Sequence, residues 1–271
     1  MARWDPWRGC RRCSEGCLHC YIHKGDAKRG VGTNLIVQTK DFDKPVAQLK
    51  KGGYKMKPGL VYVGFSTDFL IEDADAWRGE CWQMMKARPD CTFLFLTKRI
   101  ERFAQCAPAD WGSGYENVII GCTVENQDRA DFRLPIFLDL PIRHRSIIAS
   151  PLLEALDLRA YLDPDKIEEL STGGESGVQA RPCDYDWILS LRQQCVEKDI
   201  AFRFHQTGAH FYKDGKYYRI HRRDQLSQAA KANIDYRISD YYLPEKVAKA
   251  LHFQPDTPEQ TTFLDDEKGA V

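Results

Sequence analysis

The sequence lacks the features that mark membrane proteins and general polyanion binders. Its 271 residues include 39 basic and 39 acidic side chains, so the formal net charge is zero and no overall field attracts nucleic acid or anionic lipid. No apolar run is long enough to cross a bilayer, and residues 1–7 carry no apolar signal core. We therefore expect a cytoplasmic protein without a membrane partner, in which any contact with nucleic acid depends on a local patch.

A disulfide framework is not expected either. A chain of this length can bury a stable core without covalent cross-links. In a reducing compartment, its ten cysteines indicate metal ligands or buried thiols. Four of the ten fall within positions 10–20, whereas the other six are scattered: Cys81, Cys91, Cys106, Cys122, Cys183 and Cys195.

Short apolar runs alternate with amphipathic stretches along most of the chain. The runs are rich in β-branched or aromatic residues and apolar on both faces, which is typical of buried parallel strands. They are Leu60–Phe65, Thr92–Leu96, Val118–Thr123, Ser146–Ala149, Ile167–Ser171 and Ala201–Phe204. Between them we expect helices, including Asp73–Arg88 and one capped by Asp184. This alternation predicts right-handed βαβ units.

Nearly every expected strand is followed by small or polar residues at its carboxyl end. These clusters are Ser66-Thr67-Asp68, Thr97-Lys98-Arg99, Thr123-Val124-Glu125-Asn126-Gln127, Ser150-Pro151, Thr172-Gly173-Gly174-Glu175-Ser176 and His205-Gln206-Thr207. Chemistry on parallel β/α folds gathers at this end of the strands. Because six clusters occur in succession, we predict an α/β fold that is a full or partial (β/α) barrel of mostly parallel strands, rather than an open doubly wound sheet.

The chain divides into three expected segments. Residues 1–208 form the barrel domain with an N-terminal cysteine loop. Residues 209–253 form an extension packed on it, with a hairpin over Phe211–Tyr218 around Asp214-Gly215 and a helix over Gln225–Ala232. Residues 254–271, rich in Pro, Thr, Asp and Glu, are expected to be disordered.

The cysteine segment contains two Cys-x-x-Cys pairs separated by three residues, which is a strong metal-binding pattern. Cys13, Cys17 and Cys20 have the spacing that holds a [4Fe–4S] cluster by three thiolates and leaves one iron open. If Cys10 also binds, four thiolates close the site as an electron carrier or a structural zinc site. The spacing alone leaves these alternatives open.

The segment resembles the radical S-adenosylmethionine superfamily and, within it, the phage-associated three-cysteine-motif proteins. Those proteins carry Trp-Asn-Pro-x-x-Gly-Cys-x-x-x-Ser-x-Gly-Cys-x-x-Cys-Tyr near the N-terminus. The matching residues here are Trp4, Pro6, Gly9, Cys10, Ser14, Gly16, Cys17, Cys20 and Tyr21, with Asp5 in place of Asn. The likeness continues through Phe65-Ser66-Thr67-Asp68, Leu96-Thr97-Lys98-Arg99, Val124-Glu125-Asn126-Gln127, Pro151-Leu152-Leu153-Glu154, Gly173-Gly174-Glu175-Ser176-Gly177 and His205-Gln206.

The resemblance implies a [4Fe–4S] cluster, bound S-adenosylmethionine and a reducing electron donor. It makes Cys10, Cys17 and Cys20 the cluster ligands, and the general radical pattern makes Cys13 the alternative to Cys10. A 5′-deoxyadenosyl radical would then modify an unknown substrate, for which nucleic acid or a nucleotide is a candidate. His19 would stack near the adenine in this scheme.

Further residues follow as candidates for binding the cofactor and for proton transfer. By resemblance, Ser66, Thr67 and Asp68 occupy the place of the segment that binds the methionine amino group, while a helix cap is the alternative for Asp68. Thr123, Glu125 and Asn126 suit ribose or substrate. The candidate proton-transfer groups are Glu154, Glu175 and His205.

A binding protein without catalysis is the rival class. In that interpretation the cysteines form a zinc knuckle, and basic and aromatic residues near them contact nucleic acid. These residues are Arg11, Arg12, Lys24, Lys28, Arg29, Trp4, Trp7 and Tyr21. A knuckle does not require about two hundred residues of α/β scaffold, so we favour the enzyme.

Overall fold

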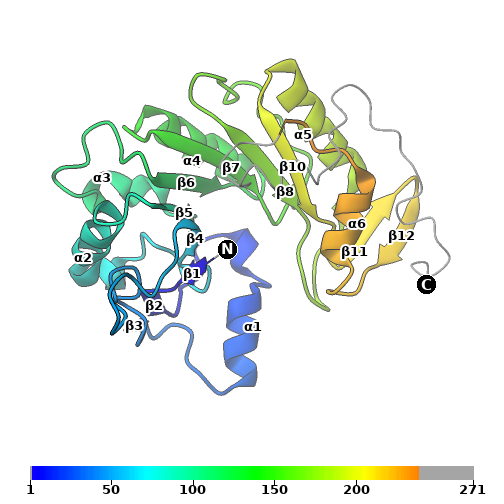
Figure 1. Ribbon diagram of the computed structural model, residues 1–271. Helices are drawn as coiled ribbons and strands as arrows, with labels where there is room; N and C mark the ends of the chain where they lie inside the picture. The colour runs from blue at the N-terminus through cyan, green and yellow to red at the C-terminus, as the bar shows by residue number, and fades with distance from the viewer. Residues whose placement is uncertain (1, 238–271) are drawn as a thin grey trace. The chain divides into compact units, whose positions relative to one another are not determined.

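The computed structural model describes residues 2–237 and has a mixed α/β fold (Figure 1). Seven strands form one sheet in the order β1-β4-β5-β6-β7-β8-β10, and every pairing described within it is parallel. The order rises along the chain without reversal, whereas a doubly wound sheet reverses at a switch point. The two end strands, β1 and β10, have no pairing with each other in the part described. The predicted class is therefore confirmed in its partial form.

All six expected strands are present; Val118–Thr123 matches at both ends, and the ends of the others shift by at most two residues. They are β4 (Gly59–Val63), β5 (Cys91–Thr97), β6 (Val118–Thr123), β7 (His144–Ala149), β8 (Glu169–Gly173) and β10 (Ala201–Gln206). The largest shift is at β8, where Ile167 precedes the strand. The edge strand β1 (Ala2–Trp4) was not predicted, because three residues are too few to show an apolar period.

The chain separates into two compact units, each described here by itself. The first comprises residues 2–14, 22–122 and 136–145, and the second comprises residues 15–21, 123–135 and 146–237. The predicted boundary at residue 208 stays a prediction. The hairpin and α6 belong to the same unit as β8 and β10. The predicted tail, 254–271, lies outside the described residues.

The first unit is built on β1, β4, β5 and most of β6, with an aromatic core. Trp7 stacks on Phe69 at a centroid distance of 5.3 Å, and Phe69 contacts Trp82 of α2 (Asp75–Lys86) and Phe95 of β5. These four side chains are fully buried. The expected helix at 73–88 is thus α2, which is preceded by the 3₁₀ turn η2 (Glu72–Ala74).

The second unit is built on most of β7, β8 and β10, with α5 (Tyr185–Glu197) packed against β8 and β10. Asp184 caps α5 as predicted, because its side chain accepts a hydrogen bond from the Asp186 N–H. Gly174 allows a close approach, since a Cβ there would lie 2.3 Å from the Thr207 carbonyl oxygen. The two-glycine segment therefore serves strand packing at this position.

The predicted hairpin is β11 (His210–Lys213) and β12 (Lys216–Arg219), joined by Asp214 and Gly215. Both turn residues have positive φ, 52° and 73°, which is the backbone conformation that Asp-Gly favours. The following helix α6 spans Gln225–Ala232, as predicted, and contacts β10.

The remaining elements are short or carry weak sequence signals. They are β2 (Trp7–Arg8), β3 (Val37–Gln38), β9 (Cys183–Asp184), η1 (Glu15–Cys17), η3 (Ile100–Arg102), α1 (Tyr21–Lys28), α3 (Phe103–Cys106) and α4 (Gln127–Asp139). Among residues 2–237, no helix has the length and apolar character needed to cross a membrane.

Candidate metal and cofactor site

The boundary between the two units falls inside the cysteine segment. Cys10 and Cys13 belong to the first unit, and Cys17 and Cys20 belong to the second. Cys17 is buried, Cys10 and Cys20 are half-buried, and Cys13 is exposed. Within the described chain, no three His, Cys, Asp or Glu side chains are gathered as a metal-binding group. The structure does show how each half of the segment is held in its own unit.

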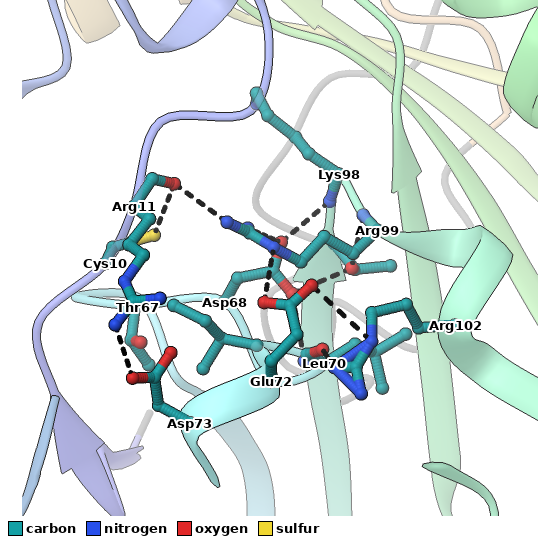
Figure 2. Close-up of polar contacts among 12 residues, drawn as sticks. Cys10, Arg11, Thr67, Asp68, Leu70, Glu72, Asp73, Lys98, Arg99 and Arg102 are labelled. Atoms are coloured by element: carbon teal, nitrogen blue, oxygen red, sulfur yellow. Dashed lines mark hydrogen bonds and ion pairs between the residues drawn. The ribbon is translucent and has the colours of Figure 1, made fainter. Parts of the chain in front are cut away.

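Asp68 is the centre of a polar network in the first unit (Figure 2). Its Oδ1 accepts hydrogen bonds from the Leu70 N–H at 2.9 Å and the Thr97 hydroxyl at 2.8 Å. Its Oδ2 accepts from the Lys98 N–H at 2.9 Å and from Arg99 Nη1 at 3.2 Å. Because β4 and β5 are parallel neighbours, their carboxyl ends bring these groups together. The predicted contact between Asp68 and an ammonium group would have to displace one of these donors.

Arg99 connects this network to the cysteine segment. Its Nη2 donates to the Arg11 carbonyl at 2.8 Å, and Arg11 lies between Cys10 and Cys13 (Figure 2). Burial lowers the pKa of Arg99, but the Asp68 carboxylate and the Cys13 and Cys10 thiols together raise it above its ordinary value. Arg99 is thus a buried, permanently charged guanidinium beside two of the four cysteines.

Ser66 and Thr67 contact the chain just before the cysteines. The Ser66 N–H donates to Asp5 Oδ1 at 3.0 Å, and the Thr67 hydroxyl donates to the Gly9 carbonyl. Both predicted cofactor-binding residues therefore fix the N-terminal strand-to-loop connection in this structure. Their direct contact with a cofactor stays a prediction.

In the second unit, the segment Glu15–Cys20 is held by a buried carboxylate. Gly16 donates its N–H to Glu125 Oε1 at 3.3 Å, and Arg133 Nη1 lies 2.7 Å from Glu125 Oε2. Arg133 also donates to the Thr123 carbonyl at 2.8 Å. Glu125 is fully buried and Arg133 is almost so. Two of the predicted cofactor-binding residues, Thr123 and Glu125, thus take part in anchoring the backbone next to Cys17.

Glu15 adds a more exposed attachment to the same segment. Its two carboxylate oxygens each lie 2.9 Å from a nitrogen of the Arg129 side chain, a bidentate pair. Hydrogen bonding from Arg129 lowers the pKa of Glu15 to about 2. Arg181 donates to the Glu15 carbonyl at 2.9 Å.

Asn126 and Glu154 both accept hydrogen bonds from backbone N–H groups at the start of α4. The Asn126 side chain accepts from the Arg129 N–H at 3.0 Å, which is the geometry of a helix N-cap. Glu154 is exposed, and its Oε1 accepts from the Gln127 N–H at 2.8 Å. Their contacts here are those of helix capping, and their roles toward a cofactor or a proton stay predictions.

Glu175 is buried and bound by Arg181. Its Oε2 accepts from the Arg181 N–H at 2.9 Å, and its Oε1 from Arg181 Nη2 at 2.8 Å. Both carboxylate oxygens are occupied by donors of Arg181, so proton transfer by Glu175 would require Arg181 to move.

His205 of β10 lies between two hydroxyl groups, one within β8 and one directly after β7. Its Nδ1 is 3.2 Å from Ser171 Oγ, and its Nε2 is 3.4 Å from Ser150 Oγ. Burial, and next the charge on Arg203, lowers the pKa of His205 to about 4. The imidazole is therefore neutral at pH 7, with one nitrogen able to accept a proton. Of the three predicted proton-transfer residues, His205 has the surroundings that fit the role best.

His19 lies half-buried between Cys17 and Cys20 in the same segment, and its contact with adenine stays a prediction. Sequence reasoning missed the arginines that hold the cysteine segment. These are Arg99 as an anchor rather than a solvated base, and Arg129, Arg133 and Arg181. The available signal was their position shortly after the polar strand ends.

Parallel strands in sequential order, with charged and hydroxyl groups at their carboxyl ends, define this chain as a partial β/α barrel with a cysteine-rich N-terminal segment. The chain belongs to the family described as "Protein of unknown function (DUF5131)", which matches residues 1–244. No curated protein and no solved structure matches the chain. Its function must therefore be inferred from its own residues.

Proposed function

We propose that this protein is a cytoplasmic iron–sulfur enzyme that cleaves S-adenosylmethionine reductively and modifies an unknown substrate, with nucleic acid or a nucleotide as the candidate class. Cys17, Cys20 and Cys10 would hold the [4Fe–4S] cluster, with Cys13 as the alternative to Cys10. The observation that carries the proposal is the spacing of the four cysteines in positions 10–20.

The donor chemistry fits an iron–sulfur cluster. Thiolates are the usual cluster ligands, and the Arg99 guanidinium supplies positive charge beside Cys10 and Cys13. In the second unit, the backbone next to Cys17 is fixed through Gly16 and the buried Glu125. Rigid attachment of ligand-bearing segments is what a preorganised metal site requires.

When bound, the cluster would supply one electron to S-adenosylmethionine, so that the C5′–S bond breaks to methionine and a 5′-deoxyadenosyl radical that takes hydrogen from the substrate. The protein's own part is to bind, orient and exclude water. Thr67 and Asp68 order the loop that carries Cys10. The neutral His205, between Ser150 and Ser171, offers a nitrogen that can accept a proton from a substrate group.

Anaerobic reconstitution with iron and sulfide tests the proposal. We expect a brown protein with about four irons and four sulfides per chain. With dithionite it should release methionine and 5′-deoxyadenosine from S-adenosylmethionine. The paired variant Cys17→Ala/Cys20→Ala should do neither, while Cys81→Ala, a buried cysteine outside the segment, should keep both properties. A colourless protein that holds one zinc ion tightly would instead support the zinc-knuckle class.

The third ligand is tested by comparing Cys10→Ala with Cys13→Ala. We expect Cys10→Ala to lose most of its iron and its cleavage activity, and Cys13→Ala to retain both. The reverse result would assign the site to Cys13. Loss of iron in both single variants would indicate a closed four-thiolate site, and the radical mechanism would then be wrong.

A further inference from the structure

The β11–β12 hairpin presents an aromatic face that no step of the proposed function uses. In its register His210 pairs with Arg219 and Tyr212 pairs with Tyr217, so these four side chains share one face. The other face is formed by Phe211 and its partners and is buried against the second unit. Tyr212 and Tyr217 are 41% and 37% exposed, which is high for paired aromatic residues.

These rings are held in place by contacts with one another. The ring centroids of Tyr212 and Tyr217 are 5.2 Å apart, and His210 stacks on Tyr217 at 5.8 Å. His210 Nε2 lies 3.0 Å from the Val178 carbonyl, which can only accept, so this nitrogen carries the proton. Nδ1 is hydrogen-bonded to the Tyr217 hydroxyl. The face is therefore ordered before any ligand binds.

Positive charge is concentrated around this face in a chain whose net charge is zero. Residues 210–224 contain five Lys or Arg side chains, of which Lys213 is buried on the opposite face, and two acidic residues, Asp214 and Asp224. Asp224 lies 3.5 Å from the Arg223 guanidinium. Asp214 is itself paired with Lys213 at 2.8 Å. The carboxylate of Asp184, which is the strand neighbour of Tyr212, is bound to the Asp186 N–H.

A second aromatic position lies in the same unit. The exposed ring of Tyr21 lies 6.0 Å from the guanidinium carbon of Arg222, at the limit of a cation–π contact. Arg222 and Arg223 are both exposed in the turn that follows β12. Tyr21 and Arg222 thus add a second pair of aromatic and basic side chains to the second unit.

We propose that the His210–Tyr212–Tyr217–Arg219 face, together with Arg222 and Arg223, binds single-stranded nucleic acid. Exposed rings on a strand face stack with unpaired bases of any sequence, and neighbouring Arg and Lys contact the phosphates. Paired bases of a duplex do not offer their faces, so a duplex is the weaker ligand. This site does not depend on the cysteines. Binding at this site therefore tests, separately from the metal centre, whether nucleic acid is the substrate class of the proposed enzyme.

The test is fluorescence anisotropy with labelled oligothymidylate and oligouridylate of about 15 nucleotides, a length that spans such a face. The full chain should bind both, and a duplex of equal length at least tenfold more weakly. Tyr212→Leu/Tyr217→Leu, which keeps apolar bulk but removes the stacking planes, should weaken binding about tenfold or more. Phe132→Leu, at a 50% exposed position of α4, is the matched control and should bind normally.

The charge contribution is tested with Arg222→Glu/Arg223→Glu against Lys198→Glu, an exposed position on the same unit. Binding by the first variant should weaken, and the magnitude of the slope of log K against log salt, measured between about 50 and 200 mM, should fall by about 1.4. Far-UV circular dichroism and thermal unfolding confirm that each variant is folded.

Several results would overturn the proposal. These are no binding to either oligonucleotide, equal binding of the duplex, or unchanged binding by the tyrosine variant. Preferential binding to phosphatidylserine vesicles would assign the face to membranes instead. The assay is repeated with Cys17→Ala/Cys20→Ala, which should bind normally. Failure of this site and failure of the proposed enzyme are therefore separate results.

Discussion

The two halves of the cysteine segment are held in opposite ways by the two units. In the first unit a buried cation, Arg99, donates to the Arg11 backbone carbonyl, and Asp68 holds that cation. In the second unit a buried anion, Glu125, accepts from the Gly16 N–H, and Arg133 holds that anion. We call these the first anchor, Arg99–Asp68, and the second anchor, Glu125–Arg133.

The two anchors differ in the donors around Asp68 and in the depth at which each ion pair is buried. Asp68 has three donors besides Arg99, two of them backbone N–H groups. The Glu125–Arg133 pair is more deeply buried, with no exposure of the Glu125 side chain. The first anchor is thus a network around one carboxylate, whereas the second is centred on a fully buried ion pair. It follows that equivalent substitutions should have unequal effects.

The largest effect is expected at the second anchor. Arg133→Met retains most of the apolar volume but leaves Glu125 buried without its cation, which typically costs about 3–5 kcal/mol of unfolding free energy. Urea unfolding followed by circular dichroism measures it. The matched control is Arg159→Met in the same unit, which removes a half-exposed pair with Glu197 and should cost less than about 1 kcal/mol. Equal losses for the two variants would contradict the assigned role of the second anchor.

Arg99→Met at the first anchor should cost less, about 2 kcal/mol, because three donors still bind Asp68. Its effect on metal should be larger than its effect on folding, since the Arg11 carbonyl and the thiols of Cys10 and Cys13 lose their cation. We expect reconstituted protein to retain markedly less iron. Arg99→Lys keeps the charge but not the forked geometry, and should restore part of the iron. If Arg99→Met retained its full iron content, the first anchor would not contribute to metal binding.

The strands that carry the two anchors could be predicted from the sequence better than the residue partners within the anchors. The strands behind both anchors could be predicted because buried parallel strands are continuous apolar runs, as in Val118–Thr123. The grouping of Asp68 with Thr97 could also be predicted, because neighbouring parallel strands end at the same edge of a sheet.

The partners within the anchors could not be predicted. In the polar cluster Thr97-Lys98-Arg99, the sequence does not show which basic side chain points inward, because a basic pair carries no period. Only the fold places Arg99 over the Arg11 carbonyl, 88 positions away along the chain. Similarly, the sequence predicts that Asn126 suits ribose or substrate, and its contact as the N-cap of α4 is seen only in the structure.

The second unit also contains a buried neutral group, His205, whereas the first anchor is a pair of charged groups. With its pKa lowered to about 4 in the folded protein, His205 binds fewer protons than in the unfolded chain below about pH 6.5. Its contribution to stability is therefore complete above pH 6.5 and is lost as the pH falls toward 4. At pH 5 we expect a loss of about 2 kcal/mol relative to pH 7.

The variant His205→Gln can still bond to Ser150 and Ser171 but cannot be protonated in this range. Urea unfolding at pH 7 and pH 5 should therefore show a smaller pH dependence for His205→Gln than for the natural chain. His144→Gln, at a half-buried histidine of β7, is the control variant. If both variants reduce the pH dependence of stability equally, the neutral state of His205 does not cause that dependence.

The smallest effect is expected at the exposed attachment of the second half, the Glu15–Arg129 pair. Because 49% of the Glu15 side chain and 32% of Arg129 are exposed, Arg129→Ala should cost only about 0.2–1 kcal/mol at pH 7, and less at high salt. The pKa of Glu15 is lowered to about 2, so its contribution is present above pH 4.5 and is lost as the pH falls toward 2. Unfolding at pH 7 and pH 3 should therefore give a smaller difference between the natural chain and Arg129→Ala at the lower pH. A loss as large as that of Arg133→Met would show that the segment near Cys17 is held mainly at its surface, and the contrast between the anchors would then be wrong.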